Sequence, residues 1–172
     1  MDELGELRHD GDYRSVRFER RYAAGPDAVW AALTDPAQLR RWLAEAVTFE
    51  NEAGGSVALR FGDEPEQVVQ GSILVYEPPR LLEYEWHWRG QTSSSVRFEL
   101  TADSDGTLLV LDHRGLPRDA ATGYAAGWHA YLDRLGAEFG GNAATRDERF
   151  ADLLPRYREL AGQAPRSTGA DR

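Results

Sequence analysis

The chain has 172 residues, 41% of them hydrophobic, which suits one domain that buries roughly 70% of its extended surface. Its 20 Lys and Arg against 29 Asp and Glu give a net charge of -9, so neither nucleic acid nor an anionic membrane is an expected partner. The absence of cysteine excludes disulfides, thiolate nucleophiles and Cys-ligated zinc. The acidic N-terminus has no apolar run, so no secretory signal is expected and the cytoplasm is the default location.

The first third of the chain predicts a strand followed by two short helices. Apolar residues alternate from Val16 to Tyr22, the period of a half-buried strand. Pro26 suits the first turn of a helix, and Pro36 opens a second helix whose apolar stripe includes Trp42. The two helices should form an elbow after the first strand.

Strand-like segments separated by turn residues fill the middle of the chain. They lie near 47–50, 57–61, 68–77, 82–88, 96–100 and 109–111. The run from Asp103 to Gly106 is a strong tight-turn signal before the last of them. Because no helix separates these segments, they should pair antiparallel as a meander.

A long amphipathic helix should follow the sheet. Its apolar stripe recurs every three or four residues over about four turns. The stripe consists of Tyr124, Trp128, Leu132, Leu135 and Phe139, and the run from Gly140 to Asn142 ends it. We expect this helix to lie against the sheet.

The last part of the chain carries a separate helical pattern. Thr145 and Glu148 have the spacing of a capping box, and an apolar stripe runs from Phe150 to Leu160, which Pro155 should kink or split. This stripe could pack on its own domain, pair with a second copy as a homodimer, or bind another protein. Self-packing is the favoured alternative, and residues 163–172 should be disordered.

This order of elements is that of the helix-grip fold, an α+β class, and several motifs carry a family resemblance. The motifs are the run from Ala24 to Pro36, the later Trp42, the run from Pro78 to Trp86, Gly106-Thr107, His113-x-Gly115-Leu116-Pro117 and Gly127-Trp128. Together they resemble the START-like (SRPBCC) superfamily and, within it, the bacterial homologues of the activator of heat-shock-protein-ninety ATPase. The chain departs from the family at Gly25, where proline is usual.

The resemblance covers about residues 14–140 and implies a division of the chain. Residues 1–13 would be an N-terminal extension, 14–141 the helix-grip domain, 142–162 an extra helical segment and 163–172 a tail. The superfamily includes lipid and hormone carriers, aromatase/cyclases and co-chaperone domains, so fold alone does not settle the activity.

Motifs for cofactor or metal chemistry are missing from the sequence. The four histidines are scattered without metal-ligand spacing, and no nucleophile elbow, P-loop or dinucleotide fingerprint occurs. We therefore expect no metal and no cofactor.

Aromatic residues that share the inner faces are the best candidates for a binding site, because rings around a hollow suit a flat or lipid-like molecule. The predicted ligand-binding residues are Trp42, Phe61, Tyr84, Trp86, Phe98, His113 and Trp128. His113 could act as a general acid or base, but a histidine satisfied by a backbone carbonyl or by Tyr84 is the favoured alternative. Arg20 could grip a ligand carboxylate or, as we favour, pair with an acidic neighbour.

Three functions remain open at this stage. The favoured one is non-catalytic binding of a small hydrophobic or aromatic molecule, as a carrier or sensor, between the sheet and the long helix. The second is an aromatase/cyclase-like or hydrolytic enzyme that uses His113. The third, implied by the resemblance alone, is a co-chaperone that contacts a chaperone ATPase.

Overall fold

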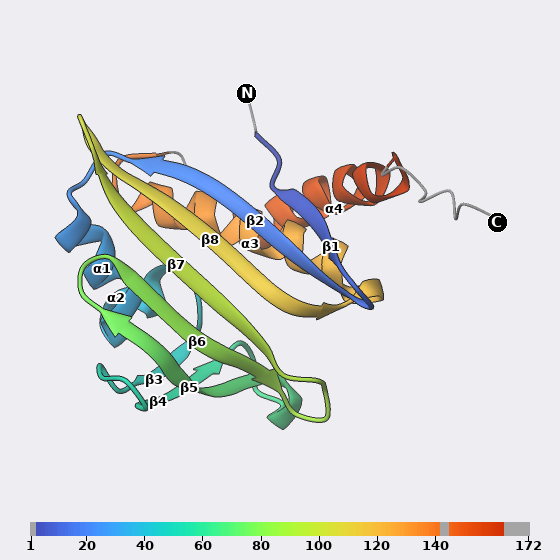
Figure 1. Ribbon diagram of the computed structural model, residues 1–172, viewed down its shortest axis with the longest axis horizontal. Helices are drawn as coiled ribbons and strands as arrows, with labels where there is room; N and C mark the ends of the chain where they lie inside the picture. Colours follow the sequence, from blue (N-terminus) through green and yellow to red (C-terminus); the bar gives the residue numbers. More distant parts are fainter. Residues whose placement is uncertain (1–2, 142–144, 164–172) are drawn as a thin grey trace.

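The computed structural model describes residues 3–141 and 145–163. Eight strands form one curved antiparallel sheet in the order β1-β2-β8-β7-β6-β5-β4-β3. The strands are β1 (Glu6–Asp10), β2 (Tyr13–Tyr22), β3 (Ala46–Phe49), β4 (Ser56–Arg60), β5 (Val68–Glu77), β6 (Leu81–Trp88), β7 (Ser94–Asp103) and β8 (Gly106–Pro117). The α-helices are α1 (Pro26–Thr34), α2 (Pro36–Trp42), α3 (Ala121–Ala137) and α4 (Arg146–Gln163), and η1 (Pro65–Gln67) and η2 (Arg118–Ala120) are short 3₁₀ turns. Figure 1 shows α3 along one face of β2 and β8, with α4 at the β1 edge.

The predicted order of elements is confirmed as β2, α1, α2, β3 to β8 and α3, an α+β helix-grip fold. Pro26 and Pro36 occupy the first turns of α1 and α2, where a missing N–H costs nothing. The Asp35 side chain caps α2 by accepting a backbone N–H of its first turn at 3.1 Å. The Trp42 indole N–H donates to the Ala32 carbonyl at 2.9 Å, which fixes the elbow between the two helices.

Two rows of inward residues cross the sheet and form the centre of the core. The first row consists of Phe18, Leu111, Phe98 and Leu82. The second row, which lies beside the first, consists of Val16, His113, Val96 and Tyr84. All eight side chains are at most 1% exposed. The second row places His113 in the middle of the core, between apolar neighbours on both adjacent strands.

Strand β1 is an element that the sequence analysis missed. It pairs with β2 at the edge of the sheet, and most of its side chains are exposed, so its residues show no apolar alternation. Just before it, a Cβ on Gly5 would lie 2.5 Å from the Phe18 ring. Glycine therefore lets the backbone lie directly on the core at this point.

Helix α4 packs on its own domain, the alternative favoured for the C-terminal stripe. Leu153 and Tyr157 are fully buried, and the Tyr157 hydroxyl accepts the Gly5 N–H at 2.7 Å and hydrogen-bonds His129 Nδ1 at 2.8 Å. Pro155 does not split the segment, because one helix runs through it from Arg146 to Gln163.

The boundaries of α4 agree only in part with those expected. The capping box is confirmed, since the Glu148 carboxylate accepts the Thr145 N–H at 3.3 Å and the Thr145 hydroxyl accepts the Glu148 N–H at 3.3 Å. The disorder predicted for residues 163–172 is wrong at Gln163, which is the last residue of α4, and residues 164–172 lie outside the described residues. None of the helices within the described ranges is long and apolar enough to cross a membrane.

Candidate functional site

A cavity of about 500 Å³ lies where β6, α3 and the first turns of α4 meet. This volume is in the range of sites for drug-sized ligands. Seven rings line it: Phe61, Trp86, Trp88, Tyr124, Trp128, Tyr131 and Phe150. We refer to it as the ring cavity.

Two periodicities bring these rings together. Trp86 and Trp88 alternate along β6, while Tyr124, Trp128 and Tyr131 recur along one face of α3. The Trp86 and Trp128 rings lie 5.2 Å apart between centroids, and Phe61 lies 5.4 Å from Trp88. These are distances at which aromatic rings attract one another.

Two glycines of α3, Gly123 and Gly127, leave the space that the rings surround. They lie one turn apart, both line the ring cavity, and a Cβ built on either would meet no atom within 4 Å. Glycine inside a helix costs about 1 kcal/mol relative to alanine. This open space was not predicted, although two glycines four residues apart inside an amphipathic helix were a visible signal.

Polar groups are few on the wall of the ring cavity. The Trp86 indole nitrogen is buried and has no hydrogen-bond partner in the described part of the chain. Burial raises the pKa of Tyr124, although the nearby Trp88 and Trp86 indoles partly offset this by stabilising its ionised form.

A second cavity of about 430 Å³ adjoins the first, and Phe61, Tyr131 and Arg146 belong to the walls of both. Its other lining residues are more polar. They include Arg40, Arg134, Glu45 and Asp147. The two cavities are therefore neighbours, the first lined mainly by aromatic rings and the second mainly by polar and charged side chains.

His113 lies behind the ring cavity and has both ring nitrogens engaged. The Trp128 indole N–H donates to His113 Nδ1 at 2.8 Å, so this nitrogen carries no proton. In the neutral ring, Nε2–H then donates to the Ser94 hydroxyl at 2.7 Å, which itself donates to the Trp86 carbonyl at 3.0 Å. Complete burial lowers the pKa of His113 to about 3, so the ring is neutral at physiological pH.

The structure separates the seven predicted ligand-binding residues into two groups. Phe61, Trp86 and Trp128 line the ring cavity. The other four, Trp42, Tyr84, Phe98 and His113, are at most 1% exposed and belong to the core behind it. Part of the expected hollow is therefore filled by side chains, and the open part lies toward α4.

The partners expected for His113 and Arg20 are corrected by the geometry. His113 is satisfied by Ser94 and Trp128 rather than by Tyr84 or a backbone carbonyl. Arg20 lies over the Phe18 ring at 5.2 Å and donates to two backbone carbonyls at 2.9 Å each, and within the described ranges it has no carboxylate partner.

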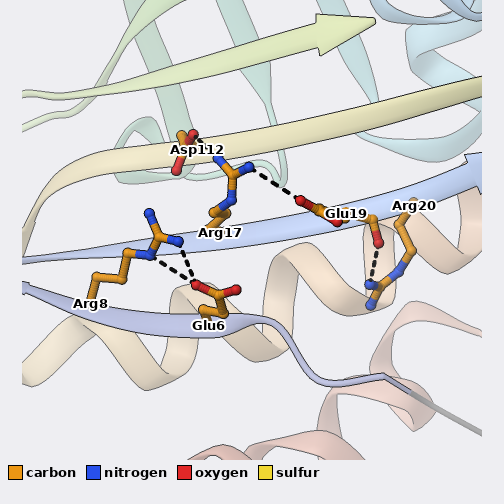
Figure 2. A network of polar contacts seen from close by, with 6 residues as sticks. All are labelled: Glu6, Arg8, Arg17, Glu19, Arg20 and Asp112. Carbon is orange, nitrogen blue, oxygen red and sulfur yellow. Dashed lines mark hydrogen bonds and ion pairs between the residues drawn. The ribbon is translucent and has the colours of Figure 1, made fainter. Parts of the chain in front are cut away.

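The outer face of the sheet near Arg20 carries ion pairs. Arg17 contacts the Asp112 carboxylate at 2.9 Å and Glu19 at 3.3 Å, and Arg8 pairs with Glu6 (Figure 2). These pairs lie on β1, β2 and β8, on the face away from α3; the Arg8–Glu6 pair is exposed, whereas the Arg17–Asp112 pair is largely buried. Among the described residues, no three His, Asp or Glu side chains gather closely enough to hold a metal ion.

Comparisons with known proteins agree with this architecture. The sequence model of the family described as "Activator of Hsp90 ATPase homolog 1-like protein" matches residues 23–140. No curated protein matches the chain significantly.

Solved structures give further matches. The crystal structure of CalU16 from Micromonospora echinospora is similar with a TM-score of 0.74 and 30% identity, over 92% of this chain and 96% of that chain. The protein encoded by gene BPP1335 from Bordetella parapertussis has a TM-score of 0.67 and 27% identity, over 95% and 92%. DynU16, a protein of the dynemicin biosynthetic locus, has a TM-score of 0.65 and 27% identity over 74% of this chain but 47% of that chain, so this chain spans about half of its length.

The matched segment contains all elements from α1 to α3 and most of the wall of the ring cavity. All of α4, β1 and β2 lie outside it. The chain therefore belongs to the Activator of Hsp90 ATPase homolog 1-like family of the START-like superfamily, as its motifs predicted.

Proposed function

We propose that this protein binds a small, flat, largely apolar molecule in the ring cavity and acts as a carrier or sensor. The observation that carries the proposal is the pair Gly123 and Gly127, which keeps room open beside the rings at a cost in helix stability. A helix selected only for packing would place larger side chains there. Gln67 and Gln91, which also line the ring cavity, supply polar groups to orient a guest.

The surroundings of His113 oppose the alternative in which it acts as a general acid or base. Such a residue needs a nitrogen within hydrogen-bond reach of the substrate and a pKa near the working pH. His113 is 0% exposed, both of its nitrogens are engaged, and its pKa is lowered to about 3. The relationship to DynU16, a protein of a biosynthetic locus, supports a small-molecule role without naming the molecule.

A neutral aromatic dye tests the proposal directly. N-phenyl-1-naphthylamine becomes fluorescent in apolar surroundings, and we expect saturable binding of one dye per chain, with a dissociation constant on the order of micromolar for a ligand of this size. The indole N–H resonances of Trp86 and Trp128 should shift during the titration, while that of Trp42, which is bonded to Ala32, should not. Absence of saturable binding, or shifts confined to Trp42, would contradict the proposal.

Purification from the native host provides a second test. Native mass spectrometry of that material should show a bound small molecule that is lost when the ring cavity is filled by mutation. If neither the wild type nor the variant with the filled cavity carries a bound molecule after purification from the host, this result would count against a carrier role.

A further inference from the structure

We propose that Arg146 makes the cavity selective for an aromatic ligand that carries an acidic group, a carboxylate or a comparable anion. This inference rests on the proposed function and specifies the class of ligand. Arg146 is the first residue of α4 and belongs to the wall of both cavities. Its guanidinium carbon lies 4.8 Å from the centroid of the Phe150 ring and 5.3 Å from that of Tyr131, so two rings of the ring cavity hold it in place.

One donor of this guanidinium is left over. Arg146 Nε is buried and has no hydrogen-bond partner within the described ranges. On the other side, Nη1 contacts the Asp147 carboxylate at 3.0 Å, but that carboxylate is 90% exposed, so solvent weakens the pair. The Arg146 side chain is 34% exposed, so part of the guanidinium is accessible to a carboxylate, which arginine can bind in bidentate fashion.

The charges around Arg146 favour an anion. Among the described residues that line the ring cavity, Arg146 is the single charged one. The adjoining cavity adds Arg40 and Arg134 against Glu45 and Asp147, which is three cations against two anions when Arg146 is included. This local excess of positive charge contrasts with the net charge of -9 of the whole chain.

The geometry thus combines an apolar ring-lined end with a cation at the boundary between the two cavities. A neutral aromatic molecule would cover the accessible part of the Arg146 guanidinium without pairing its charge, which has a cost that an acidic ligand removes. The family match ends at residue 140, before α4 begins. Helix α4 therefore adds this cation to a cavity whose other walls come mainly from the family's domain.

Two ligands of equal shape test the inference: 2-naphthoate, an anion, and 2-naphthamide, its neutral counterpart. We expect the wild type to bind 2-naphthoate more tightly. Arg146→Gln, which removes the charge, should weaken the binding of 2-naphthoate about tenfold or more and change the affinity for 2-naphthamide by less than about twofold. The reason is that only the anion loses a hydrogen bond between charged groups. Arg146→Lys, which keeps the charge but lacks the planar guanidinium, should show an intermediate loss.

Arg158→Gln is the matched control, because Arg158 lies exposed on the same helix and lines neither cavity. It should bind both ligands like the wild type, and thermal melting of each variant checks that the fold is intact. Equal weakening of both ligands by Arg146→Gln, or no change in either, would overturn the inference while the dye result could still support the proposed function. If the wild type binds neither the naphthalenes nor the neutral dye, the proposed function fails and the inference with it.

Discussion

Replacement of Gly127 by leucine should make the protein more stable and at the same time abolish ligand binding. Gly127 is buried within α3, yet a Cβ built on it would meet no atom within 4 Å. A leucine side chain would therefore extend into the ring cavity without colliding with a neighbouring residue. Glycine to leucine gains about 0.8 kcal/mol of helix propensity. Burial of the new apolar side chain adds up to about 1.5 kcal/mol, from which local overpacking subtracts about 1 kcal/mol.

The net expectation is a gain of about 1 kcal/mol, which for a chain of this size raises Tm by about 2 to 4 °C. Thermal melts followed by circular dichroism measure this gain. The same variant should bind N-phenyl-1-naphthylamine at least tenfold more weakly, because leucine occupies the position that the dye would take. The distinctive outcome is a rise in the free energy of unfolding together with a fall in dye affinity.

Gly136→Ala is the control for helix propensity. A Cβ at Gly136 would lie 3.5 Å from the Tyr22 ring, an ordinary contact, and Gly136 lines neither cavity. This variant should gain about 0.5 to 1 kcal/mol and bind the dye normally. If Gly127→Leu is destabilised by more than about 1 kcal/mol, the space beside Gly127 is not open as inferred. If the variant is stabilised but binds the dye like the wild type, the dye binds at another site.

Three further predictions concern the buried polar groups. Burial lowers the pKa of His113 from 6.5 to about 3, so as the pH falls the unfolded chain binds a proton before the folded chain does. The contribution of neutral His113 to the free energy of unfolding is therefore fully present above pH 6.5 and smaller by about 2 kcal/mol at pH 5. Urea titrations at several pH values should show a weaker pH dependence of this free energy in His113→Gln. Ser94→Ala leaves the His113 Nε2–H without an acceptor and should cost about 1 to 3 kcal/mol of unfolding free energy in the same assay. Tyr157→Phe leaves the buried Gly5 N–H unpaired and should cost about 1 to 3 kcal/mol, with faster amide exchange at Gly5.

Matched controls accompany these predictions. His9 and Tyr13 are exposed, so His9→Gln should keep the pH slope of the wild type and Tyr13→Phe should change stability by less than about 0.5 kcal/mol. A His113→Gln variant with the full wild-type slope would assign the acid sensitivity to another group. A Tyr157→Phe variant as stable as the wild type would mean that α4 does not depend on its bond to Gly5.

The secondary structure followed closely from local pattern. Alternation along β6 placed Tyr84, Trp86 and Trp88 on one face, and the prolines at 26 and 36 located the starts of α1 and α2, because these signals depend on chain geometry within a few residues. Strand β1 escaped prediction because its edge position buries little, so its residues carry no apolar period.

The candidate site was predictable only in part. That Trp86 and Trp128 face inward followed from their spacing, but whether an inward ring touches the core or a cavity depends on what fills the space opposite it. At Tyr84, Phe98 and His113 that space is filled, whereas at Trp86 and Trp128 the glycines of α3 leave it open. The residue next to a ring in space comes from another element, so no local pattern reports it.

The sequence by itself therefore determined which elements form, their order and the family to which the chain belongs, since periodicity, turn chemistry and motifs are properties of neighbouring residues. Only the tertiary structure decided that His113 is neutral and enclosed, that α4 folds back through Tyr157, and that Arg146 reaches a cavity made mostly by residues far from it in the chain. These properties depend on burial and on contacts between distant segments, which exist only once the sheet and helices have packed.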